Sequence, residues 1–376
     1  MYVMCYAALN VESVFIEPQN YKVIMIRRLR EYWCKMWYGL YPPQAVFNGR
    51  RFRKILLNPP NFNPGSWCGA GDLWIDLENE EYWLTSRPRE GEIKRGYAAE
   101  IYRSNDGENY SLVCWISKEE LSEISGVSIQ SIENQQLLKD PSTGKYFLYL
   151  STDVSKENIA GRDHRIYGGN WETYLMTADD PAGPWKGEGF VLRGDMSYDS
   201  GEARDSTIDI VDGRYIALYK ARRAGSSIVH TALALSSDGK RWTKLGEPKI
   251  DGEPQPNYLL LNGSIIAGCS GPIFVGTKTT DVVKGAALTK YFTAYLIDWR
   301  SLNLETIFEA RWISGSKYEH EQYPIHTYAD VVYDYLKDRW LILIEAVDPT
   351  YSKEPGLNLE VDRVLLYVTK PEMKRR

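Results

Sequence analysis

The sequence predicts an all-β fold, namely a five-bladed β-propeller with four-stranded antiparallel blades and a short N-terminal extension. Three observations predict it. A strand–turn–strand pattern recurs along the chain, a second turn motif recurs with the same period, and helical periodicity is weak. Tyr and Trp, which favour strands, account for 27 and 12 of the 376 residues.

The first repeat is the pattern Asp-x-x-(Ile/Tyr)-Asp, followed by a polar turn and an aromatic-rich second strand. Its three clearest copies are DLWIDLENEEYWL from Asp72, DSTIDIVDGRYIA from Asp205 and DVVYDYLKDRWLI from Asp330. Two looser copies fall between them: ENQQLLKDPSTGKYFLYLS from Glu133, and PNYLLLNGSIIAGCSGPIFVG from Pro256, in which Asn262-Gly263 is the expected turn. The five copies predict five inner hairpins.

The second repeat is a turn motif that follows each hairpin. It is clearest in SNDGENY (104–110) and SSDGKRW (236–242), and ADDPAGPW (178–185), IDWRSLNLE (from 297) and YVTKPEM (from 367) take its place elsewhere. Each unit therefore has four short strands, whose sheet hides its face against the next sheet of a closed ring. Residues 67–376 are predicted to form the propeller. Residues 1–66 are an extension that caps or closes the ring, and helices are expected only at 29–40 and 117–124.

Composition and charge exclude several classes of function. The net charge of −5 gives no electrostatic support to a nucleic-acid partner. The five cysteines are scattered and form no C-x-x-C pair, so neither a zinc site nor a disulfide framework is expected, and no cofactor is implied. No apolar run reaches the length of a membrane span, and no signal peptide is recognised, so a cytoplasmic protein is expected. The oligomeric state stays open.

In a propeller the inner strand of every blade lines the central axis, so the leading ends of the five inner strands meet in space. The residues at these ends are Asp72, Glu133, Asn134, Glu202, Arg204, Asp205, Asn257, His326 and Asp330. Gathered carboxylates raise each other's pKa, and general acid–base chemistry on a sugar bond needs carboxyls whose pKa values differ. An aspartate at a strand start can instead merely cap a turn. The second aspartate of each clear repeat (Asp76, Asp209 and Asp334) is expected to be structural and to bond backbone groups between neighbouring blades.

These motifs resemble the five-bladed propeller glycoside hydrolases, the superfamily of the arabinofuranosidase/xylosidase family 43, the invertase-like family 32 and the mannoside phosphorylase family 130. The resemblance covers residues 67–376 and is carried by GRYIALY, GKYFLYLS, the S-x-DG-x-x-W turn and TADDPAGPW. ARDS (203–206) resembles the Arg-Asp-Pro of invertase-like enzymes, whose Asp binds sugar hydroxyls and stabilises the transition state. SIENQQLLKD resembles the Glu-Asp-Pro-Arg segment of the mannoside phosphorylases, but Asn134 stands where that family has its catalytic Asp. The resemblance therefore implies the superfamily and no single family.

The resemblance implies a glycoside hydrolase acting on an oligo- or polysaccharide. Asp72 takes the place of the base or nucleophile, while Glu133 and Glu202 compete for the role of general acid. Asp205 holds substrate hydroxyls or tunes the acid. Because side chains alternate along a strand, Arg204 is expected on the face opposite Asp205, where it buttresses the next blade or contacts substrate.

The stretch SRPREGEIKRG (86–96) contains arginines that suit a carboxylate or a phosphate, although a solvated loop with its own acids is the alternative. A uronic-acid substrate would fit it, and so would inorganic phosphate in a glycoside phosphorylase that uses Arg87, Arg89 and His326 as its cradle. A non-catalytic carbohydrate-binding propeller is the third reading. The residues expected to bind carbohydrate are Trp67, Arg87, Arg89, Asn134, Arg204, Asn257, His326 and Asp330.

Overall fold

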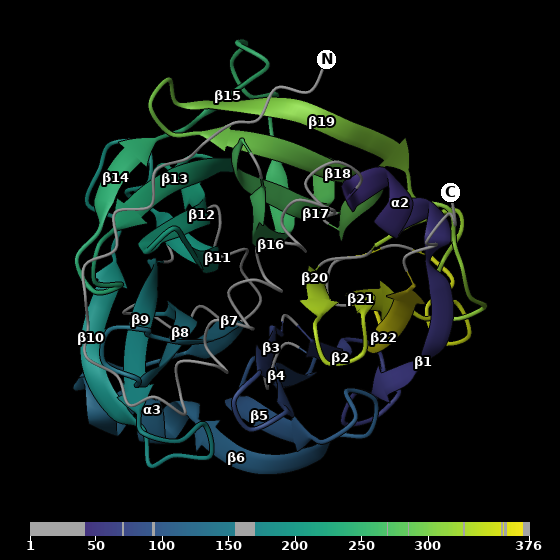
Figure 1. The fold of residues 1–376 in the computed structure, drawn as a ribbon, viewed down its shortest axis with the longest axis horizontal. Helices are drawn as coiled ribbons and strands as arrows, with labels where there is room; N and C mark the ends of the chain where they lie inside the picture. Colours follow the sequence, from purple (N-terminus) through teal and green to yellow (C-terminus); the bar gives the residue numbers. More distant parts are fainter. Residues whose placement is uncertain are drawn as a thin grey trace, which may run out of the picture.

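Sheets arranged around a common axis form the molecule (Figure 1). The structure is a computed structural model and describes all residues except 1–41, 70, 92–94, 155–169, 269, 285, 326–327, 355, 357–358 and 371–376. Two helices, α2 (Pro42–Gly49) and α3 (Lys118–Ser125), occur in the described part of the chain. α3 confirms the helix predicted near residue 117, and Ser117 caps it by accepting a hydrogen bond from the amide of Glu120. The helix predicted at 29–40 lies outside the described residues.

The first sheet in chain order is built around β4. Its strands are β2 (Ser66–Gly69), β3 (Leu73–Asp76), β4 (Glu81–Glu90), β5 (Ala98–Ser104) and β6 (Ser111–Ser117). β2 and β3 pair with opposite ends of β4, so the strand nearest the axis is interrupted between Gly69 and Leu73.

The second sheet contains eight strands in two runs of four. They are β7 (Ser131–Lys139), β8 (Tyr146–Asp153), β9 (Trp171–Ala178), β10 (Lys186–Leu192), β11 (Glu202–Val211), β12 (Arg214–Arg222), β13 (His230–Ser236) and β14 (Thr243–Gly246). A single parallel pair, Glu202 with Trp171, joins the two runs.

The last two sheets complete the arrangement. One holds β15 (Lys249–Ile250), β16 (Leu260–Gly268), β17 (Gly271–Val283), β18 (Ala286–Asp298) and β19 (Asn303–Arg311), and the other β20 (Ala329–Asp334), β21 (Arg339–Val347), β22 (Asp362–Thr369) and β1 (Arg51–Leu57). β1 lies antiparallel to β22, with Arg51 opposite Val368. A strand from before residue 67 thus supplies the outer edge of the last sheet.

Side chains at one level tie the five inner strands into a circuit. We call these residues the axial ring: Asp72, Gln136, Thr207, Ser264 and Asp330. Each bonds the backbone of the next inner strand: Asp72 accepts from Leu137 N (2.8 Å), Gln136 from Ile208 N (3.1 Å), Ser264 from Val331 N (2.7 Å) and Asp330 from Leu73 N (2.7 Å), while Thr207 donates to Gly263 O (3.0 Å). The hydrogen bonds satisfy backbone groups that point into the axis, where strands of neighbouring sheets do not pair.

A second set of contacts ties the sheets together near the hairpin turns. The Tyr82 hydroxyl donates to Asp334 (2.9 Å), and the Tyr146 hydroxyl donates to Asp76 (3.1 Å). The prediction that the second aspartate of a repeat bonds neighbouring units is therefore confirmed for Asp76 and Asp334, although the partners are tyrosines rather than backbone. Asp209 accepts a hydrogen bond from the adjacent amide of Ile210.

One predicted turn is wrong. Asn262 and Gly263 lie inside β16, and the hairpin turns between Gly268 and Gly271. Gly263 faces Gly276 across the pair, where a Cβ on Gly263 would lie 2.2 Å from the carbonyl oxygen of Val275. The glycine permits close backbone approach there, a use that the sequence does not distinguish from a turn.

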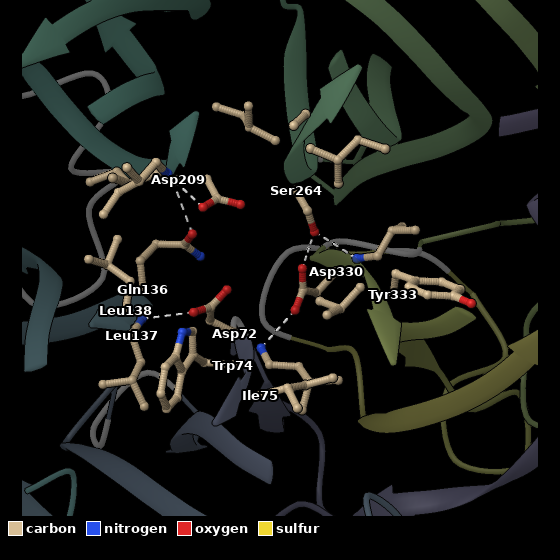
Figure 2. Close-up of a pocket in the computed structure, with 18 of the residues that line it drawn as sticks. Asp72, Trp74, Ile75, Gln136, Leu137, Leu138, Asp209, Ser264, Asp330 and Tyr333 are labelled. Carbon is tan, nitrogen blue, oxygen red and sulfur yellow. Dashed lines mark hydrogen bonds between the residues drawn. The ribbon is translucent and has the colours of Figure 1, made fainter. Parts of the chain in front are cut away.

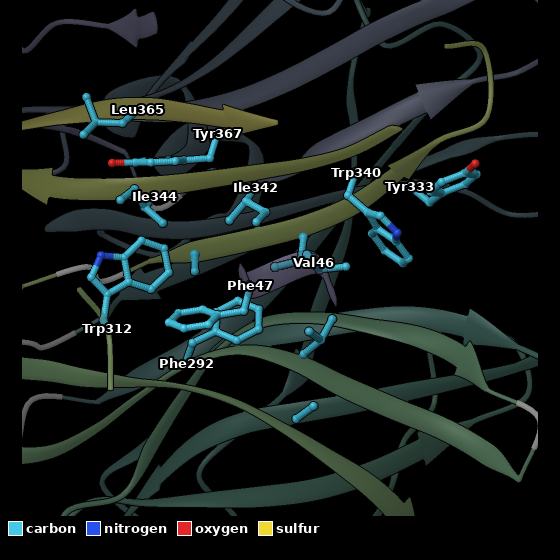
Figure 3. Packing of buried hydrophobic residues seen from close by; sticks show 14 of the residues in the cluster. Val46, Phe47, Phe292, Trp312, Tyr333, Trp340, Ile342, Ile344, Leu365 and Tyr367 are labelled. Carbon is cyan, nitrogen blue, oxygen red and sulfur yellow. The ribbon is translucent and has the colours of Figure 1, made fainter. Parts of the chain in front are cut away.

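The apolar core lies between adjacent sheets, and α2 adds to it where β18 meets β21 and β22. Figure 3 shows Phe47 of α2 against Phe292 and Trp312, with ring centroids 5.2 and 5.9 Å away. Val46 is also buried there, and its carbonyl accepts a hydrogen bond of 2.7 Å from the Thr369 hydroxyl of β22. α2 thus seals the junction between two sheets.

Candidate functional site

The inner strand β11 leaves its regular register at Asp205. Ladder pairing with β12 shifts between Arg204 and Thr207, and Asp205 has a φ of 50°, in the left-handed region. This corrects the sequence alignment of Asp205 with Asp72, because Thr207 holds the equivalent place in the axial ring. The β3–β4 turn is two residues longer than the β11–β12 turn, whereas β11 contains the bulge. The two differences offset each other, so Asp72 and Asp205 both stand ten residues before a tyrosine of the following strand.

Inner strands of neighbouring units are irregular at the same level. Pairing of β7 with β8 shifts between Ile132 and Gln135, which places Glu133 in a bulge. The first sheet is interrupted at the corresponding place, between Gly69 and Leu73. Bulges often re-aim side chains next to active sites, and here they turn carboxylates out of two adjacent inner strands.

Asp205 is held in a cationic environment. Its Oδ2 accepts from Arg204 Nη1 (2.9 Å) and the Tyr328 hydroxyl (2.8 Å), and Lys220 Nζ lies 3.5 Å away. Burial opposes ionisation, but Arg204, Lys220 and the Tyr328 hydrogen bond outweigh it and lower the pKa of Asp205. Its Oδ1 is buried without a hydrogen-bond partner among the residues that the structure describes.

The expected orientation of Arg204 is wrong. Alternation placed it on the face opposite Asp205, whereas the two side chains form an ion pair. The bulge breaks the alternation, because one residue of it is left out of the ladder. Arg204 also lies over the ring of Trp171, with 4.0 Å between Cζ and the ring centroid.

Glu133 is surrounded by arginines. Its Oε2 lies 2.8 Å from Arg87 Nε and its Oε1 lies 3.7 Å from Arg95 Nη2. Burial would raise the pKa of Glu133, but the charges of Arg87, Arg95, Arg89 and Arg204 outweigh it, so the pKa is lowered. Glu133 is therefore ionised at neutral pH, which disfavours the expected role of proton donor.

Glu202 is fully buried. Arg222 Nε donates to its Oε1 at 2.9 Å, and Arg204 Nε donates to its Oε2 at 3.3 Å. Burial is again outweighed, here by Arg204, Lys220 and Arg222, so the pKa of Glu202 is lowered. A buried carboxylate that accepts hydrogen bonds from two arginines is poorly placed to donate a proton. The contacts of Glu202 instead fix the position of Arg204.

Asp72 and Asp330 face a cavity of about 370 Å³ on the axis (Figure 2). The cavity is lined by residues of all five inner strands, among them Gln136, Asp209 and Ser264, with Trp74 and Trp340 at its sides. Glu133 and Asp205 are not among its described lining residues. The predicted carboxylates thus occupy two levels of the axis, with Asp205 two residues before the axial ring.

The environments of the two axial aspartates raise their pKa values. Burial and the negative charge of Asp330 raise the pKa of Asp72 well above its usual value. Burial raises the pKa of Asp330 to about 6, despite hydrogen bonds from the Ser264 hydroxyl and the amide of Leu73. Of the four carboxyls predicted to act in catalysis, Asp72 alone has a raised pKa.

Two arginine guanidinium groups lie near the ring of each of two tryptophans. Arg89 and Arg87 lie 4.0 and 5.2 Å above the ring of Trp67, and Arg204 and Arg95 lie 4.0 and 5.5 Å from that of Trp171. We call these four arginines the arginine cluster. Such cation–π contacts hold guanidinium groups in place. Trp67 is only partly buried, whereas Trp171 is buried.

The remaining predicted residues lie in other surroundings. Asn134 is buried and donates to the carbonyl of Ser206 (3.2 Å), which links β7 to β11. Asn257 is exposed in a turn before β16, so its predicted place at the axis is wrong, and Ser264 supplies the side chain there. The degenerate fourth repeat misled the alignment. His326 lies outside the described residues.

Three residues at this level were not found by sequence reasoning. Tyr328 bonds Asp205 and stands two residues before Asp330, at a leading end that the repeats had already marked. Glu345 and Asp362 form a buried carboxyl pair, in which burial and the Glu345 carboxyl raise the pKa of Asp362 well above its usual value. Glu345 Oε1 lies 3.7 Å from Arg87 Nη2. Nothing in the local sequence marks this pair, because its members come from two separate strands.

Neither metal clusters nor membrane spans are found in the part of the chain that the structure describes. No group of three or more His, Cys, Asp or Glu residues there is arranged to hold a metal ion. No described helix has the length and apolar character needed to cross a membrane.

Comparison with known sequences gives one partial likeness. No protein-family model matches the chain. Over 136 residues it is 29% identical to the probable arabinan endo-1,5-α-L-arabinosidase C of Aspergillus clavatus. That match covers 35% of this chain and 37% of the relative, so it spans little more than a third of the curated protein.

Solved structures match over most of the chain. A family 117 glycoside hydrolase from Zobellia galactanivorans has a TM-score of 0.56 at 14% identity, over 86% of this chain and 91% of that one. A second structure comes from family 130, the mannoside phosphorylases that contain hydrolases of β-1,2-mannosidic linkages in Candida mannan. It has a TM-score of 0.55 at 12% identity, over 88% of this chain and 96% of that one. The GH43_1 enzyme from Xanthomonas citri complexed with xylose has a TM-score of 0.53 at 8% identity, over 85% of this chain and 91% of that one. The chain therefore has the fold of the propeller glycoside hydrolases, as the sequence predicted.

Proposed function

We propose that the protein is a glycoside hydrolase on a five-bladed propeller, with the two four-stranded runs of the eight-stranded sheet counted as separate blades. The fold and the partial likeness to an arabinanase support a carbohydrate-active enzyme. Fold alone does not give function, so the proposal depends on the carboxylates at the axis. The substrate is an oligo- or polysaccharide.

The observation that carries the proposal is the backbone at Asp205. A non-glycine residue in the left-handed region costs free energy, and such strain persists mainly where the surroundings impose it and function uses it. Here the strain presents a carboxylate whose Oδ1 has no hydrogen-bond partner in the described chain. A sugar hydroxyl or an attacking water would supply the missing donor.

The roles of the carboxyls follow from their pKa values, since a glycosidase needs one protonated and one ionised carboxyl. We assign Asp205, together with Glu133, as the ionised partner that stabilises positive charge at the anomeric carbon. We assign Asp72 as the proton donor, which exchanges the roles expected from the sequence. Asp205 lies two residues before the axial ring that contains Asp72, and two residues of strand span about 7 Å along the strand direction.

The test is a screen of aryl pyranosides and furanosides and of arabinan, using wild type, Asp205→Asn and Asp72→Asn. Either substitution should lower kcat by about 100-fold or more, because general acid–base groups contribute rate factors of this size. Asp212→Asn is the matched control, because Asp212 lies at the tip of the same hairpin, is exposed and has a φ of 52°. Turnover by Asp205→Asn within twofold of wild type would refute the assignment.

A glycoside phosphorylase is the second candidate. The buried Arg87 and Arg89 beside Glu133 favour it, because guanidinium groups suit phosphate. Asn134 argues against it, because its amide is committed to Ser206. Sugar release that requires added phosphate and yields a glycosyl phosphate identifies phosphorolysis. Binding of sugars without any turnover identifies the third candidate, a non-catalytic carbohydrate-binding propeller.

A further inference from the structure

Asn262 of β16 has a buried side-chain amide that takes no part in the axial ring. The residue is 5% exposed, and its Nδ2 has no hydrogen-bond partner among the residues that the structure describes. A buried polar group without a partner costs free energy, so native proteins retain few of them, and those few often mark a functional site. The pair Asn262-Gly263, which the sequence marked as a turn, therefore needs another explanation.

The side chain of Asn262 points toward the axis. β16 pairs with β17 in unbroken register from Leu260 to Gly268, so its side chains alternate regularly between two faces. Ser264 belongs to the axial ring and lines the axial cavity, and Asn262 stands two residues before it on the same face. Asn262 is not among the described residues that line this cavity, so it lies at the next level toward the leading ends of the strands.

Two glycines hold the backbone at Asn262 close to β17. A Cβ on Gly263 would lie 2.2 Å from the carbonyl oxygen of Val275. A Cβ on Gly276 would lie 2.3 Å from the carbonyl oxygen of Asn262. That carbonyl also accepts a hydrogen bond of 3.3 Å from the Thr277 hydroxyl. The close approach of the two backbones fixes the strand from which the amide projects, as a precise binding group requires.

Asp205 and Tyr328 lie on either side of Asn262. The bonds of the axial ring put β16 between β11 and β20. Asp205, Asn262 and Tyr328 each stand two residues before a member of that ring, on or directly before these three successive strands. Asp205 and Tyr328 bond each other at 2.8 Å, so Asn262 lies at the level of their contact and between the segments that make it. Tyr328 is only partly buried, so solvent reaches this level at its side chain.

The unpaired atoms of Asp205 and Asn262 are complementary. Oδ1 of Asp205 is a buried acceptor and Nδ2 of Asn262 is a buried donor, and neither has a partner in the described part of the chain. An ionised carboxylate only accepts hydrogen bonds, and an amide nitrogen only donates them. A hydroxyl does both, because it has one O–H and two lone pairs. One sugar hydroxyl that reaches both strands would therefore satisfy both atoms.

We propose that Asn262 is a substrate-binding residue, whose amide donates to the same sugar hydroxyl that donates to Asp205. The inference rests on the proposed function, because it names a further contact of the sugar held beside Asp205. It implies strong selection for that hydroxyl, since a sugar that lacks it leaves two buried polar groups unpaired. A side chain that only supported the β16–β17 hairpin would give no such selection.

The experiment measures binding by calorimetry for wild type and Asn262→Ala. The probes are methyl α-L-arabinofuranoside, methyl β-D-xylopyranoside and methyl β-D-mannopyranoside, each beside its monodeoxy counterparts, in which hydrogen replaces one hydroxyl at a time. For at least one sugar, removal of one hydroxyl should weaken binding to wild type by about tenfold or more. This comparison needs no variant, so it remains decisive if Asn262→Ala does not fold.

The variant shows whether Asn262 reads that hydroxyl. The complete sugar should bind Asn262→Ala at least about fivefold more weakly than wild type, because one donor is lost. The deoxy sugar cannot accept from the amide, so its affinity for the two proteins should agree within about twofold. The loss on substitution is thus confined to the sugar that has the hydroxyl.

Two other asparagines give matched controls. Asn257 is exposed in the turn before β16, so Asn257→Ala should leave the affinities and the hydroxyl preference unchanged. Asn134 of β7 donates its amide to the carbonyl of Ser206 at 3.2 Å, so Asn134→Ala should lower Tm. Asn262→Ala should leave Tm unchanged or raise it, because it removes a buried amide without a partner in the described chain. A fall in Tm like that of Asn134→Ala would instead show a structural role.

Three binding results overturn the inference. They are the absence of any single hydroxyl that matters tenfold to wild type, equal affinity of wild type and Asn262→Ala for the complete sugar, and failure of every probe to bind. Cleavage of glycosides by wild type together with any of these results would leave the proposed hydrolase intact. The expected hydroxyl selection without turnover of any glycoside would instead count against the hydrolase and leave this inference standing.

Discussion

The Tyr328 hydroxyl donates a 2.8 Å hydrogen bond to Oδ2 of Asp205, which joins the segment before β20 to the bulge of β11. The contact spans 123 positions of the sequence and contributes to the lowered pKa of Asp205. Burial and the negative charge of Asp205 in turn raise the pKa of Tyr328 well above 10, so the phenol stays protonated and donates at every physiological pH.

Tyr328→Phe should therefore lower kcat by about tenfold without unfolding the protein, because one hydrogen bond to a charged group is worth about 1.5–3 kcal/mol. Loss of the donor raises the pKa of Asp205, so the acidic limb of the pH–rate profile should move to higher pH. The check is kcat/KM against pH for wild type and variant on one cleaved glycoside. An unmoved acidic limb would show that Asp205 does not set it.

Asp330→Asn should change the pH dependence of stability. Folding raises the pKa of Asp330 to about 6, so the native state binds a proton at this carboxyl more tightly than the unfolded state does. The protonated carboxyl therefore stabilises the native state at low pH, and this contribution is lost as pH rises through 6. Asn mimics the protonated carboxyl and does not titrate. The difference in Tm, variant minus wild type, should therefore become more positive between pH 4.5 and 7.5. A constant difference would contradict the raised pKa.

The contact of Tyr146 with Asp76 should couple two neighbouring units. Tyr146→Phe should cost about 1–2 kcal/mol of unfolding free energy, because it leaves a buried carboxylate short of one donor. A double-mutant cycle with Asp76→Asn, measured by urea denaturation, should give a coupling of at least about 0.5 kcal/mol. Additive effects of the two substitutions would show that the contact carries no energy.

Phe47→Ala should destabilise the protein by about 3–5 kcal/mol, because it empties the buried space between α2, β18 and β22. Phe62→Ala is the control of the same type, since Phe62 is 40% exposed and should cost far less. Denaturant unfolding of both variants is the measurement. Equal losses for the two would place α2 outside the folded core.

Repeats in the sequence predicted the fold well because each copy encodes a local structure. The Asp-Gly turn at 212–213, the S-x-DG-x-x-aromatic turns and the helix capped by Ser117 depend on residues near one another in the chain. The copy at Asp205 differs, because its local sequence does not show the register of the strand. Equal spacing of Asp72 and Asp205 from the following tyrosine hid a longer turn in one hairpin and a bulge in the other.

By itself the sequence determined that the chain forms a series of β-hairpins and that acidic residues gather at the leading ends of their inner strands. Only the tertiary structure decided what each acid does. Burial raises the pKa values of Asp72 and Asp330, and the charge of Asp330 adds to the effect on Asp72. Arginines of other strands lower the pKa of Glu133, whereas Arg204 of the same strand, Lys220 and Tyr328 lower that of Asp205. The physical reason is that a pKa depends on burial and on charges close in space, and strands far apart in the sequence supply both.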